Sequence, residues 1–166
     1  MNTHIALLRA VNVGGTGKLP MAELRAMAAA LGFDHPRTYI ASGNLVFESP
    51  LPADAARKRL EAALAAYAGR PVGVVMRSRA DLRDLLEDNP FPDAAPNRVL
   101  VSLLNEALPS DWQAGVRHQQ GEQLHARARE LFVHYGEGMG QSRLRIPAAE
   151  AGTARNLNTL RALLTL

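Results

Sequence analysis

Apolar runs and amphipathic segments alternate along the chain, and their order predicts an α+β fold. The uninterrupted apolar run in His4–Asn12 predicts a strand with both faces covered. A glycine-rich loop follows, and then Met21–Leu31, where apolar residues recur at helical spacing after Pro20. The other elements predicted in the first half are the strands Arg37–Ala41, Asn44–Phe47 and Val72–Met76, and a helix marked by Leu60, Leu64 and Tyr67 that ends at Gly69.

The first half therefore has the order βαββαβ of a ferredoxin-like unit, an antiparallel sheet with both helices on one face. Ser42 and Gly43 stand between the second and third strands, where they indicate a tight hairpin. We expect this first ferredoxin-like repeat to occupy residues 1–88.

The second half repeats this order in part, as βαββα, over residues 98–166. Ser78 and Asp81 have the spacing of a capping box at the start of a helix over Arg79–Asp88. The later predicted elements are the strand Val99–Leu104, a short helix Ser110–Ala114, a hairpin of Gln123–Arg127 with Glu130–Tyr135, and a last helix marked by Leu157, Leu160, Leu163 and Leu164. A connection rich in Pro and Asn, residues 89–97, joins the two repeats, which we expect to form one compact unit.

Composition limits the chemistry that the chain can perform. It contains no cysteine, which removes disulfides, thiolate nucleophiles and thiolate metal ligands. Acidic and basic residues interleave around a net charge of +3, so a block of charge that would indicate nucleic-acid binding is absent from the sequence. No apolar run reaches the roughly 18 residues of a membrane span. We therefore expect a cytoplasmic protein with no membrane partner.

The loop after the first strand is the first candidate for a ligand site. Gly14, Gly15 and Lys18 precede a helix N-terminus, where backbone N–H groups favour an anion. A Walker-type phosphate loop is excluded, because Leu19 replaces the magnesium-binding hydroxyl and Pro20 has no backbone N–H. The sequence leaves two interpretations open, an anion cradle and a simple tight turn.

Polar residues at strand ends and before the last helix complete the candidate site. Arg9 lies in a strand with covered faces, so it needs either an acidic partner or a ligand. Asn156 or Asn158 can cap the last helix, which leaves the other Asn and Arg155 without that role. The candidate ligand-binding residues are Arg9, Asn12, Gly14, Gly15, Lys18, Ser42, Asn44, Arg155, Asn156 and Asn158.

The remaining motifs match no established chemistry. The second glycine loop, 136–140, lacks the third glycine and the parallel βαβ unit of a dinucleotide site, and it indicates a flexible loop or a flap over a pocket. His125 and His134 share one solvated face of the predicted hairpin without a third ligand, so we predict no metal site. Catalytic signatures are absent from the sequence, and both the enzymatic status and any cofactor stay open.

Several blocks of sequence resemble the bacterial domain-of-unknown-function family numbered 1697. These blocks are Ile5–Gly15, Lys18–Arg25, Thr38–Phe47, Asn89–Phe91, Leu131–Tyr135 and Thr153–Thr159. The resemblance implies two intertwined ferredoxin-like repeats, and it implies no activity, substrate, cofactor or catalytic residue.

Three functions are consistent with the sequence. The first is the binding of a small anionic ligand, bearing phosphate or carboxylate, in a polar pocket at strand ends. The second is a nucleic-acid-binding module, which the sequence does not favour, since Tyr39 and Phe47 lie outside any basic-Gly-aromatic pattern. The third is a protein-interaction scaffold without catalytic activity. The sequence does not determine the oligomeric state.

Overall fold

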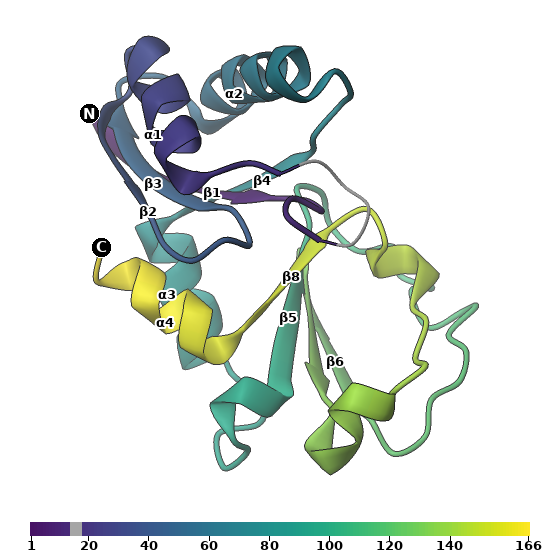
Figure 1. Cartoon of the computed structure of the whole chain (residues 1–166). Coiled ribbons are helices and arrows are strands. Elements are labelled where there is room, and N and C mark those ends of the chain that lie inside the picture. The colour runs from purple at the N-terminus through teal and green to yellow at the C-terminus, as the bar shows by residue number, and fades with distance from the viewer. Residues whose placement is uncertain (14–17) are drawn as a thin grey trace. The chain divides into compact units, whose positions relative to one another are not determined.

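The structure is a computed structural model that describes residues 1–13 and 18–166 (Figure 1). The chain divides into two compact units. Unit 1 comprises Met1–Arg83 and Ala162–Leu166, and unit 2 comprises Asp84–Arg161. Each unit contains one four-stranded antiparallel sheet, so the predicted α+β class is confirmed.

Unit 1 has the predicted order βαββαβ, and its sheet has the strand order β2-β3-β1-β4. Both helices lie on the same face of this sheet (Figure 1). The strands are β1 Asn2–Leu8, β2 Asp34–Thr38, β3 Asn44–Ser49 and β4 Val74–Ser78, and the helices are α1 Met21–Ala30 and α2 Ala53–Ala68.

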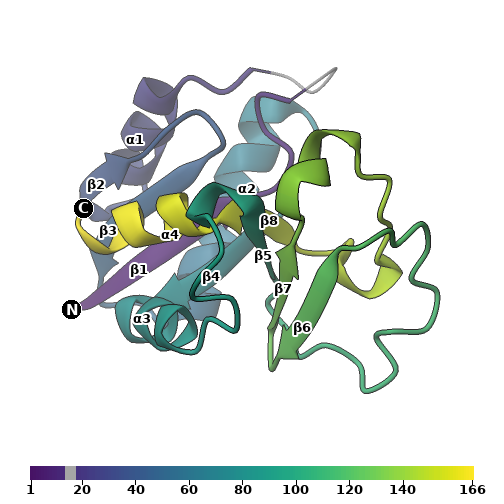
Figure 2. The ribbon, with the colours of Figure 1, turned by 90° about the horizontal axis from the view of Figure 1, so that it is seen from below.

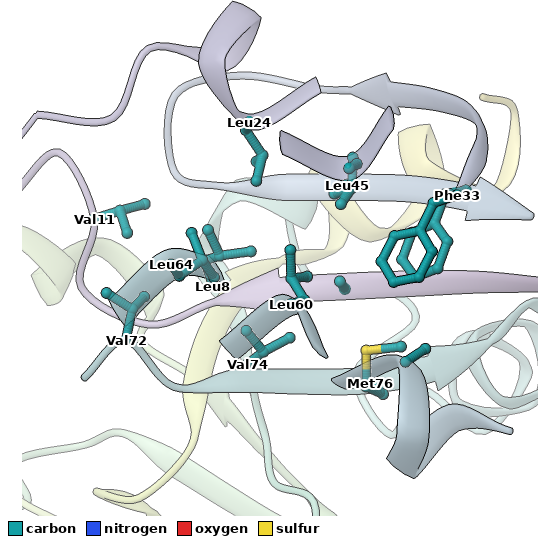
Figure 3. Packing of buried hydrophobic residues seen from close by; sticks show 14 of the residues in the cluster. Leu8, Val11, Leu24, Phe33, Leu45, Leu60, Leu64, Val72, Val74 and Met76 are labelled. Carbon is teal, nitrogen blue, oxygen red and sulfur yellow. The ribbon is translucent and has the colours of Figure 1, made fainter. Parts of the chain in front are cut away.

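The main hydrophobic core of unit 1 lies between the sheet and these two helices (Figure 3). Leu24 of α1, Leu60 of α2 and Leu8 of β1 belong to this core, and none of the three side chains is exposed. Phe33 and Phe47 stack at the end of this core, with ring centroids 4.1 Å apart. Each such leucine contributes about 2 kcal/mol on burial, so the apolar periodicity of the sequence accounts directly for this layer.

The opposite face of the sheet is also buried, as the uninterrupted apolar run of β1 predicts. Leu7 and Leu8 point to opposite faces of the strand, and both are fully buried.

Unit 1 also holds the end of the chain, because the carbonyl of Leu166 accepts hydrogen bonds from Arg79 (2.7 Å) and Arg37 (3.4 Å). The chain thus returns to unit 1 after it has built unit 2, which is the intertwined connectivity that the resemblance implies.

Unit 2 has the strand order β6-β7-β5-β8. Figure 2 shows β6 and β7 side by side as a hairpin. Its strands are β5 Val99–Leu103, β6 Gln123–Arg127, β7 Glu130–His134 and β8 Thr153–Asn156. The division of the chain into units falls within the helices α3 Arg79–Glu87 and α4 Leu157–Leu164. Short 3₁₀ helices occupy Pro96–Arg98, Gly136–Gln141 and Pro147–Ala149. The connection proposed from sequence at 89–97 stays a prediction.

One prediction for the second half was wrong, and one strand of this half was not predicted. Residues 110–114 form successive turns in place of a helix, since Pro109 and Gly115 leave too few residues to nucleate one. The strand β8 was missed because its sequence, Thr-Ala-Arg-Asn, shows no apolar alternation. It forms through long-range pairing with β5, in which Val101 lies opposite Arg155.

The helix boundaries predicted at Ser78 and at Gly69 are confirmed. Ser78 and Asp81 exchange the two hydrogen bonds of a capping box, at 2.9 and 3.0 Å. Gly69 ends α2 in the left-handed conformation, with φ of +71°. Among the described residues, no helix has the length and apolar character to span a membrane.

Candidate functional site

Arg9 lies beyond the end of its strand, and its predicted burial was wrong. β1 ends at Leu8, because Ala10 and Asn12 adopt left-handed φ angles of 51° and 56° that a strand cannot continue. Arg9 is exposed in the turn that follows, and its backbone N–H donates to the carbonyl of Gly73 (2.9 Å). A buried ion pair within the strand is therefore not its role.

Asn12 closes the base of the glycine loop with its side-chain amide. Its Oδ1 accepts from the backbone N–H of Leu19 (2.6 Å), and its Nδ2 donates to the carbonyls of Leu19 (2.9 Å) and Ala41 (2.8 Å). Asn tolerates the left-handed conformation that this arrangement needs. The candidate residues Gly14 and Gly15, inside the loop, lie outside the described residues.

Ser42 and Asn44 stabilise the turn between β2 and β3. Asn44 is fully buried, and its Nδ2 donates to the carbonyl of Tyr39 (2.8 Å) and to the Ser42 hydroxyl (2.9 Å). The bond from Asn12 to Ala41 ties the same turn to the glycine loop. The structure therefore brings Asn12, Ser42 and Asn44 together at one end of the sheet, where these bonds hold the backbone.

Arg155 lies in unit 2 and is buried, with 7% of its surface exposed. Its Nη1 donates to the hydroxyl of Thr153 (2.7 Å) and to the carbonyl of Ala154 (2.9 Å). Burial lowers the pKa of its guanidinium to about 10. These two bonds hold the guanidinium against its own strand, β8.

Asn156 is the N-cap of α4, because its Oδ1 accepts from the backbone N–H of Thr159 (2.9 Å). Asn158 is exposed on the first turn of the same helix. Asn156, Asn158 and Arg155 belong to unit 2, whereas Arg9, Asn12, Lys18, Ser42 and Asn44 belong to unit 1. That all of these residues share one site stays a prediction.

A cavity of about 170 Å³ adjoins the end of the glycine loop in unit 1. The buried side chains of Val11, Leu19, Leu64 and Val72 form its apolar floor. Lys18, Tyr67, Ala68 and Arg70 complete its lining. Lys18 was a predicted site residue, but Tyr67 and Arg70 were missed. The sequence does carry a signal for these two residues, because Tyr67 and Arg70 flank Gly69, the glycine that ends the helix.

The charge of this cavity is positive. Among the described residues, neither Lys18 nor Arg70 forms an ion pair. Lys18 is exposed and Arg70 is half-buried, while 47% of the Tyr67 surface is exposed. The carbonyl end of α2 at Ala68 attracts cations to this position. The lining of the cavity thus combines two cations with four buried apolar side chains.

The second glycine loop and the two hairpin histidines were the remaining motifs of the sequence, and neither lies in the lining of this cavity. Residues 136–141 form a 3₁₀ helix, where the Arg98 side chain donates to the carbonyls of Gly136 (3.1 Å) and Glu137 (3.2 Å). His125 and His134 do share one face of the β6–β7 hairpin. Within the described parts of the chain, no group of three or more His, Cys, Asp or Glu could hold a metal ion.

Comparisons with known proteins support the fold and the family. A solved structure, that of the conserved bacterial protein SP0830 from Streptococcus pneumoniae, matches with a TM-score of 0.77 and 23% sequence identity, covering 99% of this chain and 97% of that chain. No curated protein matches. The family model for a protein of unknown function, DUF1697, matches residues 1–132. The chain therefore belongs to DUF1697, a family of proteins of unknown function.

Proposed function

We propose that this protein binds a small anionic ligand in the cavity beside the glycine loop. The observation that carries the proposal is the pair of cations, Lys18 and Arg70, which line the cavity without an ion-pair partner among the described residues. A bound carboxylate or phosphate would supply the missing charge. Charge-assisted hydrogen bonds to such a group contribute about 1.5–3 kcal/mol each.

The floor of the cavity favours a ligand with an apolar body. Four buried aliphatic side chains offer no hydrogen bond to a polar group of a ligand, so they favour a ligand that presents apolar surface to them. Tyr67 at the rim adds an aromatic face against which a ring can pack. We therefore favour a small carboxylate with an aliphatic or aromatic body over a multiply charged phosphate in this cavity.

The other predicted residues of unit 1 support this site through the backbone. Asn12 holds Leu19, which is part of the floor, and Lys18 is the neighbour of Leu19 in the chain. Within the proposal, Gly14 and Gly15 supply backbone N–H groups to the anion. The direct participation of Arg9, Arg155, Asn156 and Asn158 remains the expectation drawn from sequence. We also propose a cytoplasmic location, on the compositional grounds given above.

A thermal-shift series tests this function. The wild-type protein is melted with benzoate, acetate, phosphate and sulfate, beside the variants Lys18→Ala and Arg70→Ala. Lys58, the other lysine of the chain, is exposed on α2 and does not line the cavity, so Lys58→Ala is the matched control. An anion at about 100 times its Kd should raise the melting temperature by about 5–10 °C.

The wild-type protein and Lys58→Ala should show this rise, and the two cavity variants should lose it. A Lys18→Ala protein that keeps the whole rise would overturn the proposal. The glycine loop would then be a tight turn only.

A further inference from the structure

A second cationic cavity lies in unit 2, in segments that the proposed function does not use. Its volume is about 440 Å³, and its lining consists of Arg117, His118, Ser142, Arg143, Leu144 and Arg145. The three arginines and the histidine are exposed, so the cavity is open to a ligand from solution.

Two of these arginines face each other across a backbone bridge. Arg117 and Arg145 form an isolated antiparallel pair, and each backbone N–H donates to the carbonyl of the other at 2.9 Å. Residues directly opposite in such a pair place their Cβ atoms about 4.5–5.5 Å apart on one side. Like charges at this separation destabilise the pair, and a bound anion would remove that cost.

The sequence around this bridge alternates, in the order Arg143, Leu144, Arg145, Ile146. In extended chain, residues two apart point to the same side, so both arginines turn to the side of Arg117. Leu144 and Ile146 line a separate cavity of about 150 Å³ over the sheet of unit 2, and Leu144 borders both cavities. Leu144 and Ile146 therefore lie over the sheet, while Arg143 and Arg145 line the larger cavity.

Two carboxylates lie near the three arginines, so the surroundings of this cavity keep a net positive charge. Glu150 lies 3.7 Å from Arg145, and both side chains are largely exposed, which makes this a weak pair. The Ser142 hydroxyl donates to Glu122 (2.5 Å) and lowers the pKa of that carboxyl, so Glu122 is ionised at neutral pH. Within the described residues, no ion pair engages Arg117 or Arg143.

From this arrangement we infer that unit 2 binds the phosphate group of a small phosphorylated ligand, with Arg117, Arg143 and Arg145 as donors. Guanidinium groups match phosphate oxygens bidentately, and three of them suit a multiply charged group better than a single carboxylate. This site differs from the one proposed in unit 1 in its residues, its polarity and its ligand.

Calorimetric titration of the full-length protein with inorganic pyrophosphate tests the inference. Arg117→Gln and Arg143→Gln should each weaken binding about tenfold or more. Arg161 is exposed in the same unit and does not line the cavity, so Arg161→Gln should stay within about twofold of wild type.

A variant that binds pyrophosphate more tightly than wild type provides a further check, because a misfolded protein would bind it more weakly. Glu150→Gln removes the carboxylate that competes for Arg145, so pyrophosphate should bind this variant more tightly than wild type. Unchanged affinity in both Arg117→Gln and Arg143→Gln would overturn the inference. So would a wild-type protein that binds a single-stranded oligonucleotide with steep salt dependence but does not bind pyrophosphate, because the arginines would then form a nucleic-acid surface.

Discussion

The side-chain amide of Asn12 binds the backbone of Leu19 in both directions. It accepts from the N–H of Leu19 at 2.6 Å and donates to its carbonyl at 2.9 Å. These bonds join the two ends of the glycine loop and present Lys18 beside the cavity that Leu19 helps to line. The position of the proposed anion site therefore depends on a residue that need not contact the ligand.

Replacing Asn12 by Ala should destabilise the protein by about 1–3 kcal/mol, because the buried backbone of Leu19 loses both partners. Asn12→Asp should cost as much or more, since its carboxylate would face two carbonyl oxygens. Urea denaturation followed by circular dichroism measures both changes. A loss below about 0.5 kcal/mol for Asn12→Ala would mean that the hydrogen bonds between Asn12 and Leu19 do not stabilise the protein.

Gly43 and Gly32 form a matched pair for testing the turn beside this loop. Both have positive φ, +90° and +83°, so Ala is strained at either position. A Cβ on Gly43 would lie 2.7 Å from Cγ2 of Val11 and 2.9 Å from Cβ of Leu8, whereas a Cβ on Gly32 would meet nothing within 4 Å. Gly43→Ala should therefore lose about 1–3 kcal/mol more stability than Gly32→Ala in parallel urea titrations. Equal losses of stability in Gly43→Ala and Gly32→Ala would contradict this prediction, because the turn would then shift away from Val11 at no cost.

Arg9→Ala should cost less than about 1 kcal/mol, because the side chain is exposed and surface ion pairs contribute little. A broken buried ion pair would cost about 3–5 kcal/mol, which is the result expected had the strand continued through Arg9. Thermal and urea unfolding of this variant separate the two cases. A loss in the higher range would contradict the exposure of Arg9.

Glu48 gives unit 1 a defined response to acid. Arg37 donates to its carboxylate at 2.8 Å, and this hydrogen bond holds the pKa of Glu48 below its ordinary value of 4.5. A folded-state pKa below the unfolded value stabilises the protein fully above the unfolded pKa, and this contribution is lost as the pH falls through the folded pKa.

Glu48→Gln should therefore be less stable than wild type by about 0.5–1 kcal/mol at neutral pH. The difference should shrink as the pH falls below about 4.5 and the wild-type carboxyl takes up its proton. Urea unfolding at a series of pH values measures it. A difference that stays constant down to acid pH would show that the Arg37 bond is not the cause.

The sequence predicted unit 1 well because its elements follow local rules. The uninterrupted apolar run of β1, the spacing of Leu60 and Leu64 in α2, and the Ser78–Asp81 capping box each act within one segment. In unit 2 the same rules found β5 and the β6–β7 hairpin, but not β8. That strand forms by pairing with β5, a contact that no local pattern in Thr153–Asn156 indicates.

The candidate site was predicted in part, for a related reason. The sequence showed that Lys18 follows a glycine loop, but not that the end of α2 would bring Tyr67 and Arg70 to the same cavity. It also showed that Asn12 and Asn44 stand at strand ends, but not that their amides bind backbone groups of distant turns. Such contacts depend on how segments pack together, so they become visible only in the folded chain.

The most direct test of the anion site is a calorimetric titration with the carboxylate that gives the largest thermal shift, beside its neutral amide. The proteins compared are wild type, the double variant Lys18→Ala with Arg70→Ala, and the control Lys58→Ala. Wild type and the control should bind the carboxylate and not the amide, and the double variant should bind it about 100 times more weakly or not at all. A double variant that binds the carboxylate as tightly as wild type would contradict the account, and so would a wild-type protein that binds the neutral amide equally well.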